Sequence, residues 1–361
     1  MTHTFGLRVR RPVLLSLVVL LAVAAPSYAA PNTRLITELA DGVYAIQHKD
    51  LPGGTSGNTT VIIGPRQVFV VDSAFLPSVA RGDIAQIRQW TDKPVGYLLN
   101  THFHNDHNNG NRAYMEAFPN LTIIAQEETK KDMDLIQPGN IERMPLEVEA
   151  MVSAYNQGKG PDGKPLSEDD KKQIAEALPG LEQIAAEFKT MRYQPPTLTF
   201  KDHLTIDIGN REVQVKYLGR GKTPGDAIAY LPKEKILVAG DLLAYPIPNT
   251  YDGYPSAWVQ TLHKMGELDA TTIVPGHGAV LHDKTYLYLV ADLLQSSVDQ
   301  VRARIREIGF PGSHSLDDVK GSVNLTSFRQ KFAGDDKDLQ AQFDDMAAAL
   351  VKITFTEAAQ R

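Results

Sequence analysis

Short runs of alternating apolar and polar residues occupy the chain from residue 35 onward. Residues 35–73 follow the period of two that is typical of antiparallel strands. The clearest runs are 43–46, 59–63 and 67–72, and Gly64-Pro65-Arg66 supplies a turn. Helical spacing follows at 78–91, and Val95 to Leu99 is a short apolar run that predicts a buried strand.

The middle of the chain, residues 126–193, changes to a polar and helical pattern. Ser167 and Asp170 resemble a capping box at a helix start. Pro138-Gly139 predicts a break in the preceding helix, and Pro179 predicts a kink in the helix that Ser167 starts. We interpret the segment as a helical insertion that does not form a catalytic unit of its own.

Strand patterns resume at 197–238, and helical patterns follow at 256–267, 285–308 and 338–352. This order predicts a mixed α/β protein. We expect the main domain to span 30–290 and a helical C-terminal extension to span 291–361.

The first thirty residues differ from the rest. Arg8, Arg10 and Arg11 precede an apolar run of a dozen residues, which is shorter than the ~20 residues that cross a membrane. Small residues around Ala29 complete the pattern of a signal peptide over 1–29. We therefore expect a periplasmic or secreted protein with no stable membrane anchor after cleavage.

Composition narrows the chemistry. The 361 residues include 42% hydrophobic and 22% charged residues, a normal balance for a globular protein. The net charge of −6 and the lack of a basic stripe argue against a nucleic-acid partner, so we expect a small-molecule substrate. There is no cysteine, so any metal must be held by nitrogen and oxygen ligands.

A cluster of histidines follows the strand at 95–99. His102, His104, Asp106 and His107 bring three imidazoles and a carboxylate within six residues. In an extended segment, alternation turns His102 and His104 to one side, and a following turn presents Asp106 and His107 to a neighbouring point. This spacing suits two adjacent metal ions.

The cluster matches the H-x-H-x-D-H signature of the metallo-β-lactamase superfamily, which includes glyoxalase II-like enzymes and class B β-lactamases. The resemblance extends from about residue 38 to 282. It includes the motifs Val70-Val71-Asp72, Ala239-Gly240-Asp241 and Pro275-Gly276-His277-Gly278. It implies a four-layer αβ/βα sandwich with the site on loops at one sheet edge.

The resemblance also implies a role for each matching residue. His102 and His104 belong to a first metal site, and Asp106, His107 and His277 to a second. Asp241 would bridge the two sites. Asp72 would either orient a ligand histidine or cap a turn after its strand. The other histidines, His48 among them, are isolated from these motifs and are expected at surface or turn positions.

One position departs from the family pattern. The family usually has histidine in a G-H-T-x-G-D segment as the third ligand of the first site. Here the segment reads Gly221-Lys222-Thr223-Pro224-Gly225-Asp226. A lysine ammonium has no free lone pair, so Lys222 cannot bind zinc unless it loses a proton.

Three interpretations of Lys222 remain open. In the first, the protein holds one zinc ion at the second site. In the second, two zinc ions bind and Lys222 is a weak neutral ligand. In the third, catalysis is lost and the pocket only binds.

The resemblance favours a hydrolase that acts on a carbonyl compound: a lactam, lactone, ester or thioester. Asp106 would anchor the metal and orient water, and Lys222 would stabilise a developing oxyanion. Tyr245, Tyr251 and Tyr254 follow the bridging aspartate and are candidates for a substrate pocket. The alternative is a catalytically inactive metal- or ligand-binding member of the same fold. A redox member would need an electron-carrier domain, and the sequence contains no sign of one.

Overall fold

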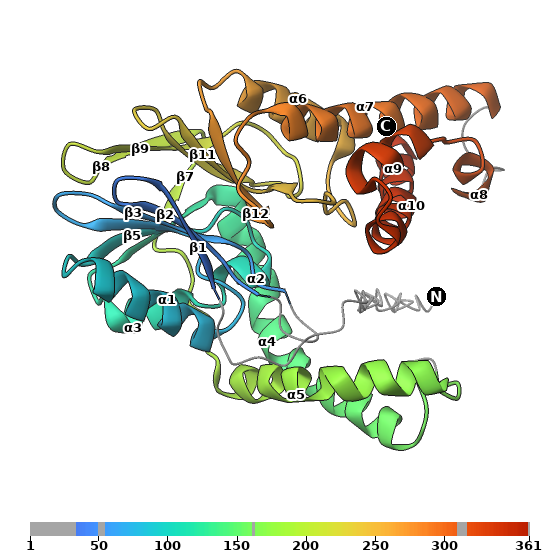
Figure 1. The fold of residues 1–361 in the computed structure, drawn as a ribbon, viewed down its shortest axis with the longest axis horizontal. Coiled ribbons are helices and arrows are strands. Elements are labelled where there is room, and N and C mark those ends of the chain that lie inside the picture. Colours follow the sequence, from blue (N-terminus) through green and yellow to red (C-terminus); the bar gives the residue numbers. More distant parts are fainter. Residues whose placement is uncertain (1–33, 50–54, 161–162, 309–315, 360–361) are drawn as a thin grey trace, which may run out of the picture.

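In the computed structural model, two β-sheets pack face to face (Figure 1). The structure describes residues 34–49, 55–160, 163–308 and 316–359. The first sheet holds its strands in chain order: β1 (Leu35–Ala40), β2 (Val43–Gln47), β3 (Thr59–Ile63), β4 (Val68–Val71), β5 (Val95–Leu99), β6 (Thr122–Gln126) and β7 (Leu198–Phe200). Neighbours are antiparallel from β1 to β4 and parallel from β4 to β7.

The second sheet has the order β12-β11-β10-β9-β8. Its strands are β8 (His203–Asp207), β9 (Glu212–Tyr217), β10 (Ala227–Leu231), β11 (Ile236–Ala244) and β12 (Thr272–His277). All pairs are antiparallel except β11 with β12. Apolar side chains from both sheets, such as Val43 and Phe69 from the first and Val213 and Val215 from the second, form the core between them.

Helices cover the outer faces of both sheets, which confirms the predicted four-layer sandwich. On the first sheet, α1 (Pro77–Trp90) and α3 (Asn111–Ala117) pack against β-strand residues such as Val61 and Val70. Helix α1 starts with Pro77 in its first turn and buries Ala80, Ile84 and Ile87 at helical spacing. The second sheet is covered by α6 (Pro255–Gly266) and α7 (Thr285–Ile308).

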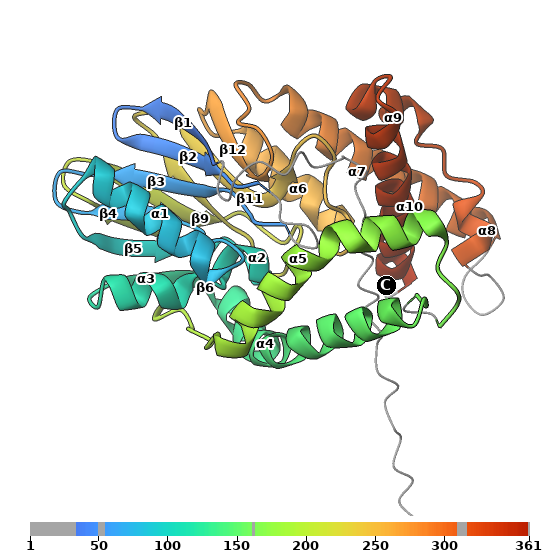
Figure 2. The ribbon, with the colours of Figure 1, turned by 60° about the horizontal axis from the view of Figure 1, so that its bottom comes forward.

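The insertion is a two-helix arm that projects beyond the ends of the sheets (Figure 2). It consists of α4 (Glu127–Asn156) and α5 (Glu168–Thr190), and the Ser167–Asp170 capping box is present. The predicted break at Pro138 is wrong, because α4 runs on through it. Helix α5 also continues through Pro179, and the kink there stays a prediction. Packing of α4 against α5 offsets the cost of the interior prolines, which is about 3 kcal/mol each in an unsupported helix.

The C-terminal extension continues from α7 through α8 (Leu316–Lys320), α9 (Thr326–Ala333) and α10 (Lys337–Ala359). Its buried side chains join the same cluster as the outer face of the second sheet, for example Phe343 with Leu242. The proposed signal peptide lies outside the described residues. Among the helices that the structure describes, none has the length and apolar character needed to cross a membrane.

Candidate metal centre

The ends of four strands bring the predicted site residues together at one edge of the sandwich. Asp72 follows β4, and the histidine cluster follows β5, where the short helix α2 (Asn105–Asn108) carries Asp106 and His107. Asp241 lies within β11 and His277 ends β12. The two segments of the second sheet thereby face the histidine cluster of the first.

Asp106, His107 and His277 form the second cluster, and their potential ligand atoms lie within 4.8 Å of one another. His277 Nε2 is 3.0 Å from Asp106 Oδ2, and His107 Nε2 is 3.2 Å from His277 Nε2. The side chain of His107 is completely buried. Two imidazoles and a carboxylate therefore converge on one point.

His102, His104 and Asp241 form the first cluster, again within 4.8 Å. His102 Nε2 lies 3.0 Å from His104 Nδ1 and 3.7 Å from Asp241 Oδ2. The other oxygen, Asp241 Oδ1, lies 3.2 Å from His107 Nε2. One carboxylate thus faces both clusters.

In three of the histidines, one ring nitrogen contacts a side chain outside the clusters and the other ring nitrogen faces the site. His107 Nδ1 lies 2.8 Å from Asp72 Oδ2, His102 Nδ1 lies 3.0 Å from Thr101 Oγ1, and His104 Nε2 lies 3.0 Å from Asp252 Oδ2. Such contacts fix the orientation and the tautomer of an imidazole. They leave His107 Nε2, His102 Nε2 and His104 Nδ1 turned inward.

The protonation states follow from burial and from the neighbouring charges. Burial lowers the pKa of His107, but the negative charges of Asp106, Asp241 and Asp72 raise it by more. The pKa of His107 therefore lies well above its usual value. Burial and the charge of His107 hold the pKa of His102 well below the usual value. Burial raises the pKa of Asp241, but His277, His107 and His102 outweigh it, and the pKa is lowered.

This donor set fits a metal cation. Asp241 Oδ1 is buried and has no hydrogen-bond partner among the described residues, although the inward nitrogens of His107 and His277 lie 3.2 and 3.5 Å away. Lone pairs that face one another at such distances need a positive charge between them. A proton on His107 meets that need in a metal-free protein, and a divalent ion bound by nitrogen and oxygen ligands meets it more completely.

Several residues that sequence reasoning did not single out hold these groups in place. Asn58 donates through Nδ2 to the carbonyls of Pro275 (3.0 Å) and Gly278 (2.9 Å), on either side of His277. Asn108 donates to the carbonyls of Phe103 and His104. All four acceptors are backbone carbonyls, so no motif in the sequence marks these two asparagines.

Lys222 lies buried in the β9–β10 connection, where 2% of its side chain is exposed. Its Nζ donates to Asn249 Oδ1 at 2.8 Å and to the carboxylate of Asp252. Both partners belong to the connection between β11 and α6. The tyrosines of this segment were predicted from the sequence as site residues, and Asp252 was not. A buried lysine needs a counter-charge, and that need is the signal that could have identified Asp252.

The three candidate pocket tyrosines lie on the same connection. Tyr245 is 40% exposed and packs edge-on against Tyr286 of α7, with ring centroids 5.1 Å apart. Tyr251 is also largely exposed. Tyr254 lies under the guanidinium of Arg220, 5.1 Å from its ring centroid. Their role in substrate binding stays a prediction.

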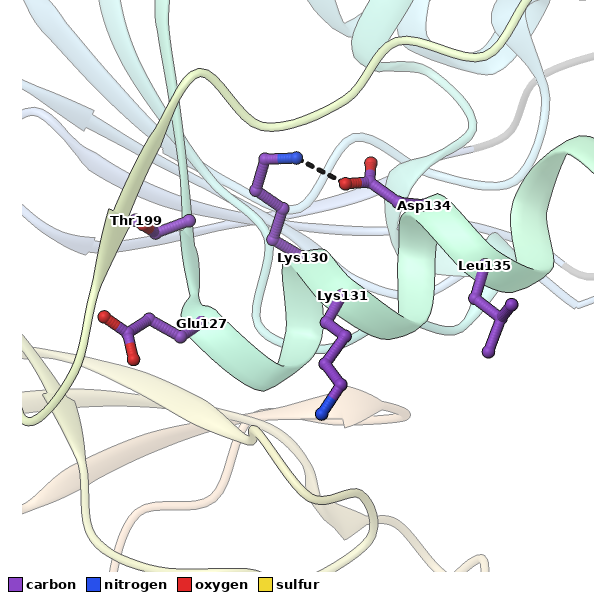
Figure 3. A pocket seen from close by; sticks show the side chains of 6 residues that line it. All are labelled: Glu127, Lys130, Lys131, Asp134, Leu135 and Thr199. Atoms are coloured by element: carbon purple, nitrogen blue, oxygen red, sulfur yellow. Dashed lines mark hydrogen bonds and ion pairs between the residues drawn. The ribbon is translucent and has the colours of Figure 1, made fainter.

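A surface hollow of about 600 Å³ lies away from these clusters, at the start of α4 (Figure 3). It is lined by Glu127, Lys130, Lys131, Asp134, Leu135 and Thr199. Figure 3 shows five of these side chains along α4 and Thr199 on the neighbouring strand β7, with Lys130 paired to Asp134. The hollow contains no histidine, and we assign it no part in the chemistry.

Comparison with known proteins gives a family match over the region that carries the site. The family model described as the metallo-β-lactamase superfamily matches residues 52–277. A linear primary-alkylsulfatase from Pseudomonas sp. is 28% identical over 228 residues, which is 60% of this chain and 40% of that protein. A type 2 metallo-β-lactamase from Bacteroides fragilis is 36% identical over 89 residues, 23% of this chain and 36% of that protein. The chain therefore spans well under two thirds of these relatives.

Solved structures share the fold at low sequence identity. The DIM-1 metallo-β-lactamase superposes with a TM-score of 0.51 and 17% identity, covering 73% of this chain and 98% of its own. The stereoselective inverting sec-alkylsulfatase Pisa1 from Pseudomonas sp. superposes with a TM-score of 0.60 and 16% identity. It covers 88% of this chain and 50% of its own.

Proposed function

The chain belongs to the metallo-β-lactamase superfamily, and from that premise we propose that it is an exported, zinc-dependent hydrolase. The observation that carries the proposal is the pair of His/Asp clusters that share Asp241, with the inward nitrogens of His102, His104 and His107 held ready by outer contacts. A binding protein without catalysis would not need two adjoining ligand sets at a partly open edge.

The proposed substrate is a carbonyl compound: a lactam, lactone, ester or thioester. Zinc in these clusters supplies Lewis acidity, which polarises a carbonyl group and acidifies water near neutral pH. Asp106 is 17% exposed and orients an incoming water molecule through its carboxylate. Tyr245 and Tyr251 offer exposed rings to the organic part of the substrate. The proposal that Lys222 stabilises a developing oxyanion stays a prediction, and two of its donors are engaged by Asn249 and Asp252.

We further propose one tightly held zinc ion at Asp106, His107 and His277, with Asp241 beside them. The first cluster offers His102, His104 and the shared Asp241, and Lys222 does not complete it because its ammonium is held by Asp252. A second ion there would bind more weakly.

Sulfate-ester hydrolysis is a second candidate. It is favoured by the alkylsulfatase relative, which matches 60% of this chain, and by the alkylsulfatase structure, which covers more of it than the lactamase does. A panel of a chromogenic cephalosporin, a lactone, a thioester, a p-nitrophenyl ester, p-nitrophenyl sulfate and a linear alkyl sulfate separates the two. Turnover of the carbonyl compounds that a chelator abolishes supports the main proposal, and turnover of the sulfates alone replaces it.

Asp106→Ala should remove both the tightly held zinc and the hydrolytic activity, because Asp106 is the carboxylate of the second cluster. Elemental analysis after dialysis should give close to one zinc per wild-type chain and a small fraction of that in the variant. Asp269→Ala, which removes an exposed carboxylate paired with Lys235, is the control. Full zinc content and full turnover in Asp106→Ala would refute the assignment.

Export is part of the proposal and rests on residues 1–29. The exported chain should begin at or near Ala30, because the small residues before it fit signal peptidase. Mass spectrometry of protein recovered from the periplasm measures this directly. An uncleaved chain in the inner membrane would mean that the segment is an anchor.

A further inference from the structure

Lys222 connects two loops at the edge of the first cluster. Its ammonium is nearly inaccessible to solvent and donates to Asn249 and Asp252, both on the connection between β11 and α6. A buried ammonium without a counter-charge is strongly unfavourable, and the carboxylate that contacts the Lys222 ammonium directly is that of Asp252. The position of the 245–254 loop is therefore tied to Lys222.

Asp252 uses its two oxygens for different partners. Oδ1 accepts from Lys222, and Oδ2 lies 3.0 Å from His104 Nε2. A neutral imidazole has one N–H, and a carboxylate beside Nε2 places the proton there. His104 Nδ1 then keeps its lone pair and faces His102 Nε2 at 3.0 Å, within the first cluster.

The loop that carries Asp252 is fastened on both sides. Tyr254 N donates to the carbonyl of Gly221 at 2.8 Å, next to Lys222. On the other side, Thr250 Oγ1 donates to the carbonyl of Met346 on α10 at 3.1 Å. About half of the Asp252 side chain is exposed, so these anchors and the Lys222 pair fix a carboxylate that would otherwise be free to turn toward water.

We propose that Asp252 is a positioning residue for His104 and that Lys222 is its counter-ion, so that together they hold the 245–254 loop beside the first cluster. The inference rests on the proposed metal-binding function. The lysine that replaces a ligand histidine of the family thus serves the site by orienting another ligand. It contributes no lone pair of its own.

The first experiment tests the loop. Hydrogen exchange of amides 245–254 is measured by mass spectrometry in the metal-free full chain, in Lys222→Met, in Asp252→Asn and in the double variant. Lys222→Met should speed exchange of this segment by about tenfold, and Asp252→Asn by at least as much, because it leaves the buried ammonium unpaired; the double variant should be no faster than Asp252→Asn, because both changes remove the same contact. Asp269→Asn, which breaks the exposed Asp269–Lys235 pair, should leave it unchanged. Unchanged exchange in both single variants would overturn the role of Lys222.

The second experiment tests the positioning of His104. Zinc affinity is measured by competition with a fluorescent chelator, and the cobalt-loaded protein is compared by its visible absorption bands. Asp252→Asn should weaken the more weakly held ion by about 10- to 100-fold and change its cobalt bands, while the tight ion changes by less than about twofold. Asn249→Ala is the matched control, because Asn249 accepts a hydrogen bond from Lys222, whereas the ring nitrogens of His104 face His102 and Asp252.

Equal effects of Asp252→Asn and Asn249→Ala on the weaker ion would reduce Asp252 to a loop anchor and overturn the positioning role. A wild-type chain that takes up no second ion even at millimolar zinc would overturn it as well. A chain that binds both ions but hydrolyses nothing in the substrate panel would refute the proposed function and leave this inference intact. Neither readout depends on turnover.

Discussion

Glycines bring backbone unusually close to the ligands at the metal centre. A side chain at Gly57 would overlap the imidazole of His107, and one at Gly276 would overlap Asp241 Oδ1. Both glycines lie on segments that hold His107, Asp241 and His277 in their inward positions. The absence of a side chain at these two points is therefore part of the site.

Gly57→Ala should displace His107 and weaken retention of the tight zinc ion by about 10- to 100-fold, because a ligand moved off its axis loses most of its contribution. Zinc content after dialysis against a weak chelator measures the loss. Gly139→Ala is the control, since Gly139 lies within α4 with no atom near its added carbon. That change should keep zinc and stabilise the helix by about 0.5–1 kcal/mol. Equal zinc in both variants would contradict the close approach.

The ligand residues were predictable at the residue scale, because His102, His104, Asp106 and His107 lie within six positions of one another. Asp252 and Asn58 were not, since Asp252 contacts His104 across 148 positions and Asn58 contacts Pro275 across 217. Spacing along the chain contains no information about such pairs. The fold creates them by placing the β11–α6 connection beside the histidine cluster and the segment before β3 beside β12.

At the scale of elements, the spacing of hydrophobic residues predicted the antiparallel strands and the amphipathic helices well. The three strands at 43–72 and helix α1 lie within a residue or two of their predicted bounds. Strands β6 and β12 were missed, and β11 was predicted only to Val238 although it runs to Ala244. These strands are mostly buried and pair in parallel with a neighbour, so their sequences lack the alternation that marks a half-exposed strand.

The insertion supports the site as well as projecting from the fold. Thr129 on α4 donates to the carbonyl of Gly225 at 2.6 Å, in the segment that carries Lys222. Gln137 on the same helix donates to the carbonyl of Phe103, between the two histidines of the first cluster. The start of α4 therefore braces two loops of the metal centre, which its polar sequence did not indicate.

Helix α1 depends on a buried charge that the sequence analysis overlooked. Asp83 is fully buried on α1, and Arg34 Nε lies 3.0 Å from its Oδ1. His48, expected at a surface or turn position, is instead buried, and its Nε2 lies 3.2 Å from Asp83 Oδ2. The expectation for His48 is wrong because the ring finds polar partners inside the fold: Nε2 also lies 3.2 Å from Thr59 Oγ1, and a histidine with such partners is buried readily.

Arg34→Ala should lower the free energy of unfolding by about 3–5 kcal/mol, because it leaves the carboxylate of Asp83 buried without its cation. Urea unfolding followed by circular dichroism measures the change. Arg112→Ala removes an exposed pair with Glu116 on α3 and should cost no more than about 0.5 kcal/mol. Similar midpoints for the two variants would show that the Arg34–Asp83 pair contributes little.

Besides the core between the two sheets, a further buried cluster on the outer face of the second sheet joins the sandwich to the C-terminal extension. Phe343, Met346 and Leu350 of α10 belong to the same buried cluster as Leu242 of β11 and Trp258 of α6. The extension also reaches the loop beside the site, because Thr250 Oγ1 donates to the carbonyl of Met346 on α10. Sequence periodicity predicted α7 and α10 but not the short helices α8 and α9. It could not reveal that the extension shares this core, since each contact joins residues far apart in the chain.

Because they share a core, we expect the sandwich and the extension to unfold as one unit. Phe343→Ala should lower the free energy of unfolding by about 3–5 kcal/mol, because it opens a cavity where Phe343 is 1% exposed. Tryptophan fluorescence, which reports Trp90 on α1 and Trp258 on α6, should shift in urea together with the far-ultraviolet circular dichroism.

Phe343→Leu keeps most of the buried volume and should shift both probes in the same direction by a smaller amount. An independent extension would behave differently: the circular dichroism would show an early helical transition, while the fluorescence of both tryptophans kept its wild-type midpoint. Because Trp258 packs in the same cluster as Phe343, we expect the fluorescence and circular dichroism transitions to coincide. We also expect zinc to be lost over the same range of urea, because the β11–α6 connection then loses its hydrogen bond to α10.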